Sequence, residues 1–247
     1  MEDMRKFWDD REALGPVASV FDPNDSRGHK FEYVSLVEKK AISKALSDMS
    51  PTSTILDFGC GTGNLIKMFS DSDYRFTGVD ISINMLKYCH RHLLKKPVLF
   101  VQYDGESLPF PNNSFDVCVT NGVLVYLSKT EQFLSTLKEI NRVLKPGGRL
   151  IASEHTRRRE VYQPKRMKFL RSSENIIKLI SRAGFCLKES RSFRRGHFPL
   201  IYLIRYGFVH TKMFPYIARL ESLWGKVFGQ PFFDYADTIF IAEKPSD

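Results

Sequence analysis

The chain has 247 residues, of which 43% are hydrophobic, and its formal net charge is +9. This length and apolar content suit one globular unit, and the four scattered cysteines exclude the paired spacing of a zinc site or a disulfide framework. The charged segment Met1 to Lys6 is followed by no apolar signal segment, so we expect a cytoplasmic protein with no bound metal.

The first two thirds of the chain alternate predicted strands and helices. An irregular N-terminal stretch contains a short helix near Phe7, and apolar residues at helical spacing predict a helix over 34–48. Strands are predicted at 54–58, 75–79, 98–102, 115–119 and 148–153, with helices from 63, over 83–94 and over 130–144. This alternation is typical of a mostly parallel sheet with helices on both faces.

The last third carries an insertion between its two predicted strands. Ser172 begins a helix that ends at Gly184, a strand follows at about 185–191, and the last strand covers 237–242. Residues 199–209 and 214–228 predict two aromatic-rich amphipathic helices, too short to span a bilayer. They fit a lid, a membrane contact or simple packing on the sheet edge.

The segment from Ile55 to Gly63 reads as a buried strand that runs into a glycine turn and a helix. A nucleotide-type cofactor site has this shape, and Asp80 follows the next strand, where it could hold two ribose hydroxyls. Asp57 would repel a pyrophosphate and attract an ammonium group. The pattern therefore favours S-adenosylmethionine over a dinucleotide, and a glycine turn that binds nothing is the alternative.

Five ordered motifs carry a resemblance to the class I S-adenosylmethionine-dependent methyltransferases, in the small-molecule branch that includes the ubiquinone and menaquinone C-methyltransferases. The motifs are residues 55–63, 78–82, 104–110, 115–117 and 144–148. This resemblance implies a Rossmann-like, doubly wound, mostly parallel seven-stranded sheet with an antiparallel last strand. The helical insertion between the last two strands is an addition to that fold.

The resemblance also implies which residues hold the cofactor. Asp57 and the backbone of the glycine turn would hold its methionine part, Asp80 its ribose, and Asn121 would lie near the sulfonium. The remaining expected contacts are Gly59, Cys60, Gly61 and Gly63 in the turn, Ile81 and Met85 against the adenine, Asp104, Gly105 and Glu106 at its amino group, and Lys30 at the cofactor carboxylate.

Catalytic candidates come from the strand ends, because ligands of such sheets lie at the carboxyl edge. His155, directly after the fifth predicted strand, is our first choice for a general base, and Tyr126 would line the junction of donor and acceptor. Arg157 and Arg158 suit an anionic group on the acceptor, and His197 could touch it. The alternatives are a solvated histidine, a packing tyrosine and a solvated charge run.

We expect residues 1–247 to form one methyltransferase domain. Its parts are an N-terminal cap and first helix (1–50), a cofactor-binding core (51–155), the rest of the sheet (156–192 and 236–247) and a helical lid or acceptor-binding insertion (193–235). Between residues 140 and 230 lie 20 of the 37 basic residues but only 5 of the 28 acidic ones, which favours an anionic partner.

The expected reaction is O-methylation of a small or medium anionic acceptor, such as a glycan, a glycolipid or a polyprenyl-linked intermediate, with S-adenosylhomocysteine as the second product. Peripheral contact with the inner membrane face is compatible with the insertion. The alternatives are methylation of a modified wobble uridine in transfer RNA and a non-catalytic partner of a membrane-associated enzyme. The basic region 140–230 shows no RNA-binding module, so we expect nucleic acid less than a small acceptor as the partner. The oligomeric state stays open.

Overall fold

A computed structural model describes residues 2–12, 25, 27–93, 97–195, 198–232 and 234–246. Its central sheet has seven strands: β1 (Thr54–Phe58), β2 (Arg75–Asp80), β3 (Leu99–Gln102), β4 (Phe115–Asn121), β5 (Leu144–Arg157), β8 (Cys186–Arg195) and β9 (Tyr235–Glu243). They run in the order β3-β2-β1-β4-β5-β9-β8. The first five are parallel, and β9 is antiparallel to both of its neighbours. The predicted fold class is confirmed.

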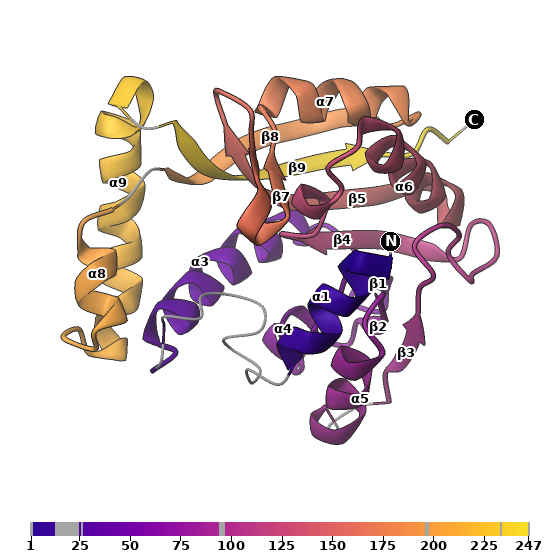
Figure 1. Cartoon of the computed structure of the whole chain (residues 1–247), viewed down its shortest axis with the longest axis horizontal. Coiled ribbons are helices and arrows are strands. Elements are labelled where there is room, and N and C mark those ends of the chain that lie inside the picture. Colours follow the sequence, from indigo (N-terminus) through magenta and orange to yellow (C-terminus); the bar gives the residue numbers. More distant parts are fainter. Residues whose placement is uncertain are drawn as a thin grey trace.

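Helices cover both faces of this sheet (Figure 1). The α-helices are α1 (Glu2–Glu12), α3 (His29–Ala45), α4 (Asn64–Met68), α5 (Ile83–His92), α6 (Thr130–Val143), α7 (Ser173–Arg182), α8 (Leu200–Arg205) and α9 (Phe214–Phe232). Short 3-10 turns lie at η1 (Leu124–Tyr126), η2 (Pro164–Arg166) and η3 (Thr211–Met213). The described residues also form a small antiparallel hairpin of β6 (Val161–Gln163) and β7 (Lys168–Leu170).

The strands bury side chains on both faces because successive residues of a strand point to opposite sides. Leu150 and Ala152 of β5 pack in the apolar layer under α6 and α7, whereas Ile151 between them packs in the layer under α3 and α4. Each layer supplies the burial that stabilises its helices, so the sheet is held as a rigid platform between them.

A third apolar cluster stands beside the sheet and joins α3 to the inserted helices α8 and α9. Tyr33 and Val34 of α3 pack there against Ile201 and Ile204 of α8 and Phe214 of α9. In Figure 1 α8 and α9 stand at the left end, next to α3 and beyond the strands. In the part of the chain that the structure describes, no helix is both long and apolar enough to cross a membrane.

Several elements differ from the sequence predictions: α8 ends at Arg205 rather than residue 209, and β8 continues to Arg195 rather than about 191. Helix α3 begins at His29 rather than residue 34, directly after Gly28, which has a φ of 71°. Strand β5 continues to Arg157 instead of ending at 153, because β9 begins at Tyr235 and pairs with it to the end. The hairpin of β6 and β7 was not predicted, since three-residue strands carry too little alternation to be recognised.

Candidate functional site

A cavity lies at the carboxyl edge of the parallel strands. The strand order reverses between β1 and β4, and the loops that diverge at such a point leave a crevice for a ligand. Residues that follow β1, β2 and β4 line the cavity, together with the ends of β5 and β9 and with α1 and α3 as covers. The polar lining residues include Glu38, Asp57, Asp80, Asn121, Glu154, His155, Lys168 and Asp237.

The turn after β1 is shaped for close approach. Gly59 has a φ of 73°, and a Cβ there would lie 2.5 Å from a methyl group of Val123, so only glycine fits. The amide of Gly61 donates to Asp80 Oδ2 at 2.8 Å, and the amide of Ser82 donates to Asp80 Oδ1 at 2.9 Å. Asp80 therefore joins the two loops, and its carboxylate has lone pairs left for a ligand hydroxyl.

Asp57 is the unusual group at this end. Its carboxyl is buried, and its Oδ2 accepts no hydrogen bond from any described residue. Burial, with the negative charge of Asp80 nearby, raises the pKa of Asp57 to about 8. A buried carboxyl without a donor is unfavourable, so the site favours a ligand that brings a cationic donor.

The structure brings most of the predicted cofactor residues into this lining, but not all of them. Gly59, Cys60, Gly61, Asp80, Ile81, Met85 and Asn121 line the cavity with Asp57. Asp104, Gly105, Glu106, Gly63 and Lys30 are not among the lining residues. The Asp104 carboxylate is exposed and accepts from the amides of Glu106 and Ser107, while Lys30 donates its amide to Asp25. A cofactor contact through these five residues stays a prediction.

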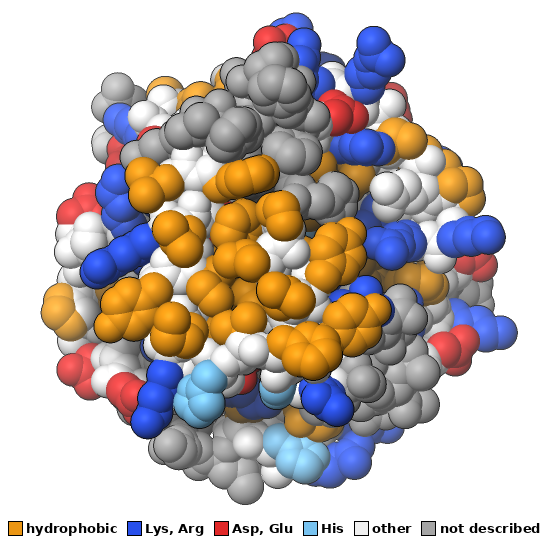
Figure 2. Space-filling view, turned by 90° about the vertical axis from the view of Figure 1, so that its left-hand side faces the viewer, with side chains coloured by type: hydrophobic (Ala, Val, Ile, Leu, Met, Phe, Trp, Pro, Cys, Tyr) orange, Lys and Arg blue, Asp and Glu red, His pale blue; other side chains and the backbone are white. Residues whose placement is uncertain are grey.

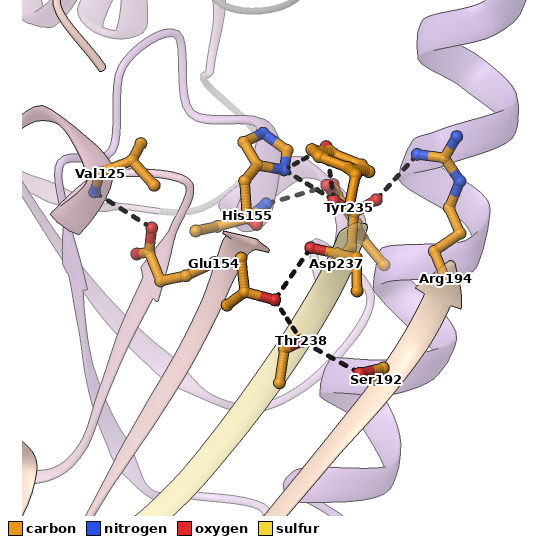
Figure 3. Close-up of polar contacts among 12 residues, drawn as sticks. Val125, Glu154, His155, Ser192, Arg194, Tyr235, Asp237 and Thr238 are labelled. Carbon is orange, nitrogen blue, oxygen red and sulfur yellow. Dashed lines mark hydrogen bonds and ion pairs between the residues drawn. The ribbon is translucent and has the colours of Figure 1, made fainter. Parts of the chain in front are cut away.

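His155 lies inside β5, not after it, and this places it in a row of polar residues across three strands. In the register of the sheet, His155 is opposite Asp237 on β9, and Asp237 is opposite Arg194 on β8. His155 Nδ1 lies 2.6 Å from Asp237 Oδ1, and Arg194 Nη1 donates to Asp237 Oδ2 at 2.8 Å. Figure 3 shows the imidazole between the strand and Tyr235, whose hydroxyl donates to Asp237 at 2.7 Å.

This row fixes the protonation of the histidine. Burial alone would raise the pKa of Asp237, but Arg194 and His155 offset it and hold that pKa well below its usual range. An ionised carboxylate only accepts, so Nδ1 of His155 carries the donated hydrogen and Nε2 keeps its lone pair. Burial lowers the pKa of His155, and in the described part of the chain Nε2 has no hydrogen bond. The side chain is thus a neutral base that faces the cavity.

Arg194 extends the network to the inserted helices. Its Nε donates to Glu221 of α9 at 2.9 Å, and the hydroxyl of Tyr33 on α3 donates to the same carboxylate at 2.6 Å. Arg194, Glu221 and Asp237 are all nearly or fully buried. A buried cation between two buried anions holds β8, β9 and α9 in one arrangement, since any one of these charges alone would be costly to bury.

Glu154, next to His155, points the other way and organises the turn after β4. Its carboxylate accepts from Thr120 Oγ1 and from the backbone amides of Val123, Leu124 and Val125, at 3.0 to 3.3 Å. Figure 3 shows this carboxylate directed at Val125. The bonds hold η1 and therefore Tyr126, which lines the cavity.

Aromatic rings and a lysine close the end of the cavity that contains His155. Trp8 of α1 packs edge to face on Tyr126 with 4.9 Å between ring centroids, and Lys168 Nζ lies 5.1 Å from the centre of the Tyr126 ring. Burial lowers the pKa of Lys168 to about 8. Burial also raises the pKa of Tyr126 well above its usual range, so its hydroxyl stays protonated. Tyr126 is therefore a wall of the cavity and not its base.

Two of the three predicted acceptor-binding residues, Arg157 and Arg158, lie outside the cavity lining. Arg157 pairs with Asp234 at 3.1 Å, Arg158 is exposed, and neither lines the cavity. His197 falls outside the described residues. Among the residues that the structure describes, no cluster of His, Cys, Asp or Glu side chains could hold a metal ion.

Sequence reasoning missed Trp8, Glu38, Lys168 and Asp237, which all line the cavity. A signal existed for Asp237: it precedes the apolar run of an antiparallel strand, whose start lies at the same edge as the carboxyl end of β5. Lys168 lies in the unpredicted hairpin, and Trp8 reaches the cavity through α1, which is distant in sequence from the core. Neither position carried a pattern.

A family model described as "methyltransferase domain" matches residues 56–152. The chain is 42% identical over 117 residues to the demethylmenaquinone methyltransferase of Lactococcus lactis, and 39% identical over 126 residues to the ubiquinone/menaquinone biosynthesis C-methyltransferase UbiE of Ectopseudomonas mendocina. These alignments cover 45% of both chains in the first case and 48% of both in the second. The chain thus matches about half the length of these relatives.

Solved structures show the same fold over most of the chain. The phosphoethanolamine N-methyltransferase 2 of Haemonchus contortus, in complex with S-adenosyl-L-methionine, matches 84% of this chain and 52% of its own with a TM-score of 0.63 at 21% identity. The [4+2]-cyclase SpnF matches 85% and 82% with a TM-score of 0.61 at 21% identity. The motifs, the sheet order and the family match agree: residues 56–152 match a methyltransferase domain, and the chain has the fold of the class I S-adenosylmethionine-dependent methyltransferases.

Proposed function

We propose that this chain is an S-adenosylmethionine-dependent methyltransferase that acts on a small acceptor with an ionisable hydroxyl group. A single observation supports this reading most strongly: one cavity has a buried carboxyl oxygen without a donor, Asp57 Oδ2, at one end and a neutral histidine paired to Asp237 at the other. The first suits a cationic cofactor, and the second suits removal of a proton.

The cofactor end fits S-adenosylmethionine in three respects. Asp57 would accept from the ammonium group, which supplies the missing donor. The glycine turn lets the backbone approach the ligand, because Gly59 has no side chain; a Cβ there would also collide with Val123. Asp80 would take the ribose hydroxyls with the lone pairs left by its two backbone bonds.

The acceptor end supplies the proton chemistry. When bound, S-adenosylmethionine supplies a methyl group on a sulfonium, and the protein has to align the acceptor and exclude water. His155 Nε2 would take the hydroxyl proton of the acceptor, and Asp237 would stabilise the resulting imidazolium. The ammonium of Lys168 would stabilise the oxygen anion that remains, and Trp8 and Tyr126 would cover the acceptor.

The relatives change the acceptor that we expected from the sequence. Their printed names concern quinone biosynthesis, and one specifies a C-methyltransferase, so they support carbon rather than oxygen and do not support a glycan. Arg157 and Arg158, on which the anionic acceptor depended, lie outside the cavity lining. Removing the proton of a phenol makes its oxygen and the adjacent ring carbons nucleophilic, so the same base serves either atom. Attack through carbon would break the methyl–sulfur bond and release S-adenosylhomocysteine, and the methylated ring carbon would then lose its hydrogen as a proton to restore the aromatic ring. We therefore propose a hydroxylated aromatic acceptor methylated at carbon.

Transfer of a labelled methyl group tests this function. The purified chain is incubated with methyl-labelled S-adenosylmethionine and, separately, a dihydroxynaphthalene, a simple sugar phosphate and bulk transfer RNA. We expect label in the aromatic acceptor, with the methyl on carbon by NMR. Label in the sugar phosphate or the transfer RNA would contradict the proposed acceptor. Cofactor binding without transfer to any of the three would favour a non-catalytic role.

A further inference from the structure

Exposed hydrophobic side chains gather on the inserted helices. Of the eleven large hydrophobic side chains that are exposed in the described residues, eight lie between Tyr202 and Leu223. They are Tyr202, Leu203, Tyr206, Phe208, Met213, Tyr216, Leu220 and Leu223, and we call them the α8–α9 face. Figure 2 shows a continuous apolar surface on this side of the molecule, with lysines, arginines and histidines at its edges.

Helix α9 is apolar on two opposite sides. Phe214 and Ile217 are buried against α3 and α8, while Tyr216, Leu220 and Leu223 are 61%, 52% and 58% exposed. The exposed three recur at the spacing of one helix face, so they form a stripe and not scattered contacts. A helix that is hydrophobic on both sides is normally covered on both, and large exposed apolar patches mark interaction sites.

The charges of the α8–α9 face have one sign. Residues 199–225 contain Arg205, Lys212 and Arg219 and a single acid, Glu221. Glu221 is buried and bonded to Arg194, so it does not contribute to the surface, whereas Lys212 and Arg219 are exposed. Tyrosine and phenylalanine beside lysine and arginine are the side chains that suit the boundary between lipid headgroups and acyl chains.

We propose that the α8–α9 face docks on a lipid bilayer that carries anionic headgroups. The apolar stripe would enter the headgroup region, and Lys212 and Arg219 would meet the negative surface. A second copy of the chain fits less well. A two-fold contact sets the same patch against itself, so the cations would face each other without an exposed acid of these helices to pair with. The inference does not depend on the proposed reaction.

Sedimentation of the full chain with vesicles tests this docking. We expect the protein to sediment with vesicles of phosphatidylcholine and phosphatidylglycerol, to bind phosphatidylcholine alone more weakly, and to be released by salt. The double variant L220Q/L223Q should bind at least about tenfold more weakly, because two leucines that would enter the bilayer are lost. The double variant K212Q/R219Q should lose about fivefold for each charge removed.

Matched variants elsewhere keep the result specific. Leu99 on β3 is 59% exposed and Lys138 on α6 is exposed, so L99Q and K138Q should sediment like the wild type. Circular dichroism confirms that each variant is folded. Failure of the folded wild type to bind either kind of vesicle would overturn the proposal. So would equal losses in L99Q and L220Q/L223Q, or a dimer that L220Q/L223Q dissociates and that binds no lipid.

Discussion

The two ends of the cavity are built in different ways. At the cofactor end, Asp57, Gly59 and Gly61 lie within five residues of one another, and Asp80 follows the neighbouring strand. At the acceptor end, His155 and Asp237 are 82 residues apart and meet only because β5 and β9 pair. Local sequence shapes the first end, and the register of the sheet shapes the second.

This difference has a physical consequence. The glycine turn is tied to the neighbouring strand β2, where Val79 and Asp80 accept from its amides, whereas the histidine depends on charges brought from β8, β9 and α9. The acceptor end can therefore diverge among proteins that keep the same cofactor end, because the strands after β4 can carry different side chains at unchanged backbone positions. The family match agrees with this division, since it ends at residue 152, just before His155.

The largest expected effect separates the two ends directly. His155→Ala should lower turnover by about 100- to 10,000-fold, the usual contribution of a positioned base, and leave the affinity for S-adenosylmethionine nearly unchanged. Initial rates at saturating cofactor and a binding titration measure the two quantities. His90, exposed on α5, gives the matched control His90→Ala. Unchanged turnover in His155→Ala would remove it as the base.

Arg194→Met tests whether the acceptor end rests on buried charge. The substitution leaves Glu221 and Asp237 buried without their cation, so the free energy of unfolding should fall by about 3–5 kcal/mol. Lys188→Met removes a lysine that is 54% exposed and pairs with Glu243 at 3.1 Å, and should cost about 1 kcal/mol or less. Urea unfolding compares them, and equal losses would mean that the Arg194 network is no more than a surface pair.

Asp80→Asn addresses the cofactor end alone. Loss of the negative charge should weaken binding of S-adenosylmethionine by about 1–3 kcal/mol, roughly 5- to 150-fold, because the charge-assisted bonds to the ribose are lost. Asp104→Asn is the comparison: Asp104 is exposed and outside the cavity lining, so its loss should leave binding unchanged unless it also holds the adenine as the sequence predicts. If both variants lose the same affinity for S-adenosylmethionine, Asp104 contacts the bound adenine as the sequence predicts, although it lies outside the cavity lining.

The pH dependence of kcat/KM for the acceptor, measured at saturating S-adenosylmethionine so that Asp57 is already ionised, should show the two groups of the acceptor end. Protonated His155 cannot accept a proton, and burial lowers its pKa, so activity should hold at neutral pH and fall about tenfold per unit only on the acid side of the ordinary histidine range. Lys168, whose pKa burial lowers to about 8, should lose its charge and its effect above that pH. Lys168→Met should remove the alkaline decline. An acid limb centred above pH 7 would contradict the assignment of His155.

How much the sequence could predict follows the same division. The spacing of Asp57, Asp80 and the glycines predicts the cofactor end, because that spacing is itself the motif. The alternation of strands and helices predicts the sheet. Asp237 and Arg194 could not be paired with His155 without the register of β5, β9 and β8, which no local pattern encodes.

Position within an element also limited the prediction. The sequence predicts His155 just past the end of a strand, yet it lies within β5. Its protonation depends on Asp237, its partner on the neighbouring strand. Arg157 and Arg158 were chosen for their charge, but Asp234 binds the side chain of the first and the amide of the second, and both lie outside the cavity lining. A run of arginines in the sequence shows that cations are present but does not predict the direction of their side chains.

Calorimetric titration of S-adenosylmethionine at pH 7, in two buffers of different ionisation enthalpy, tests the central claim most directly. Asp57 has a pKa of about 8 in the free protein and should ionise against the ammonium group, so binding should release close to one proton. Asp57→Asn should abolish the release, and His155→Ala should keep both affinity and release. Absence of binding, or binding with no proton released, would contradict a cavity that grips a cationic cofactor at Asp57.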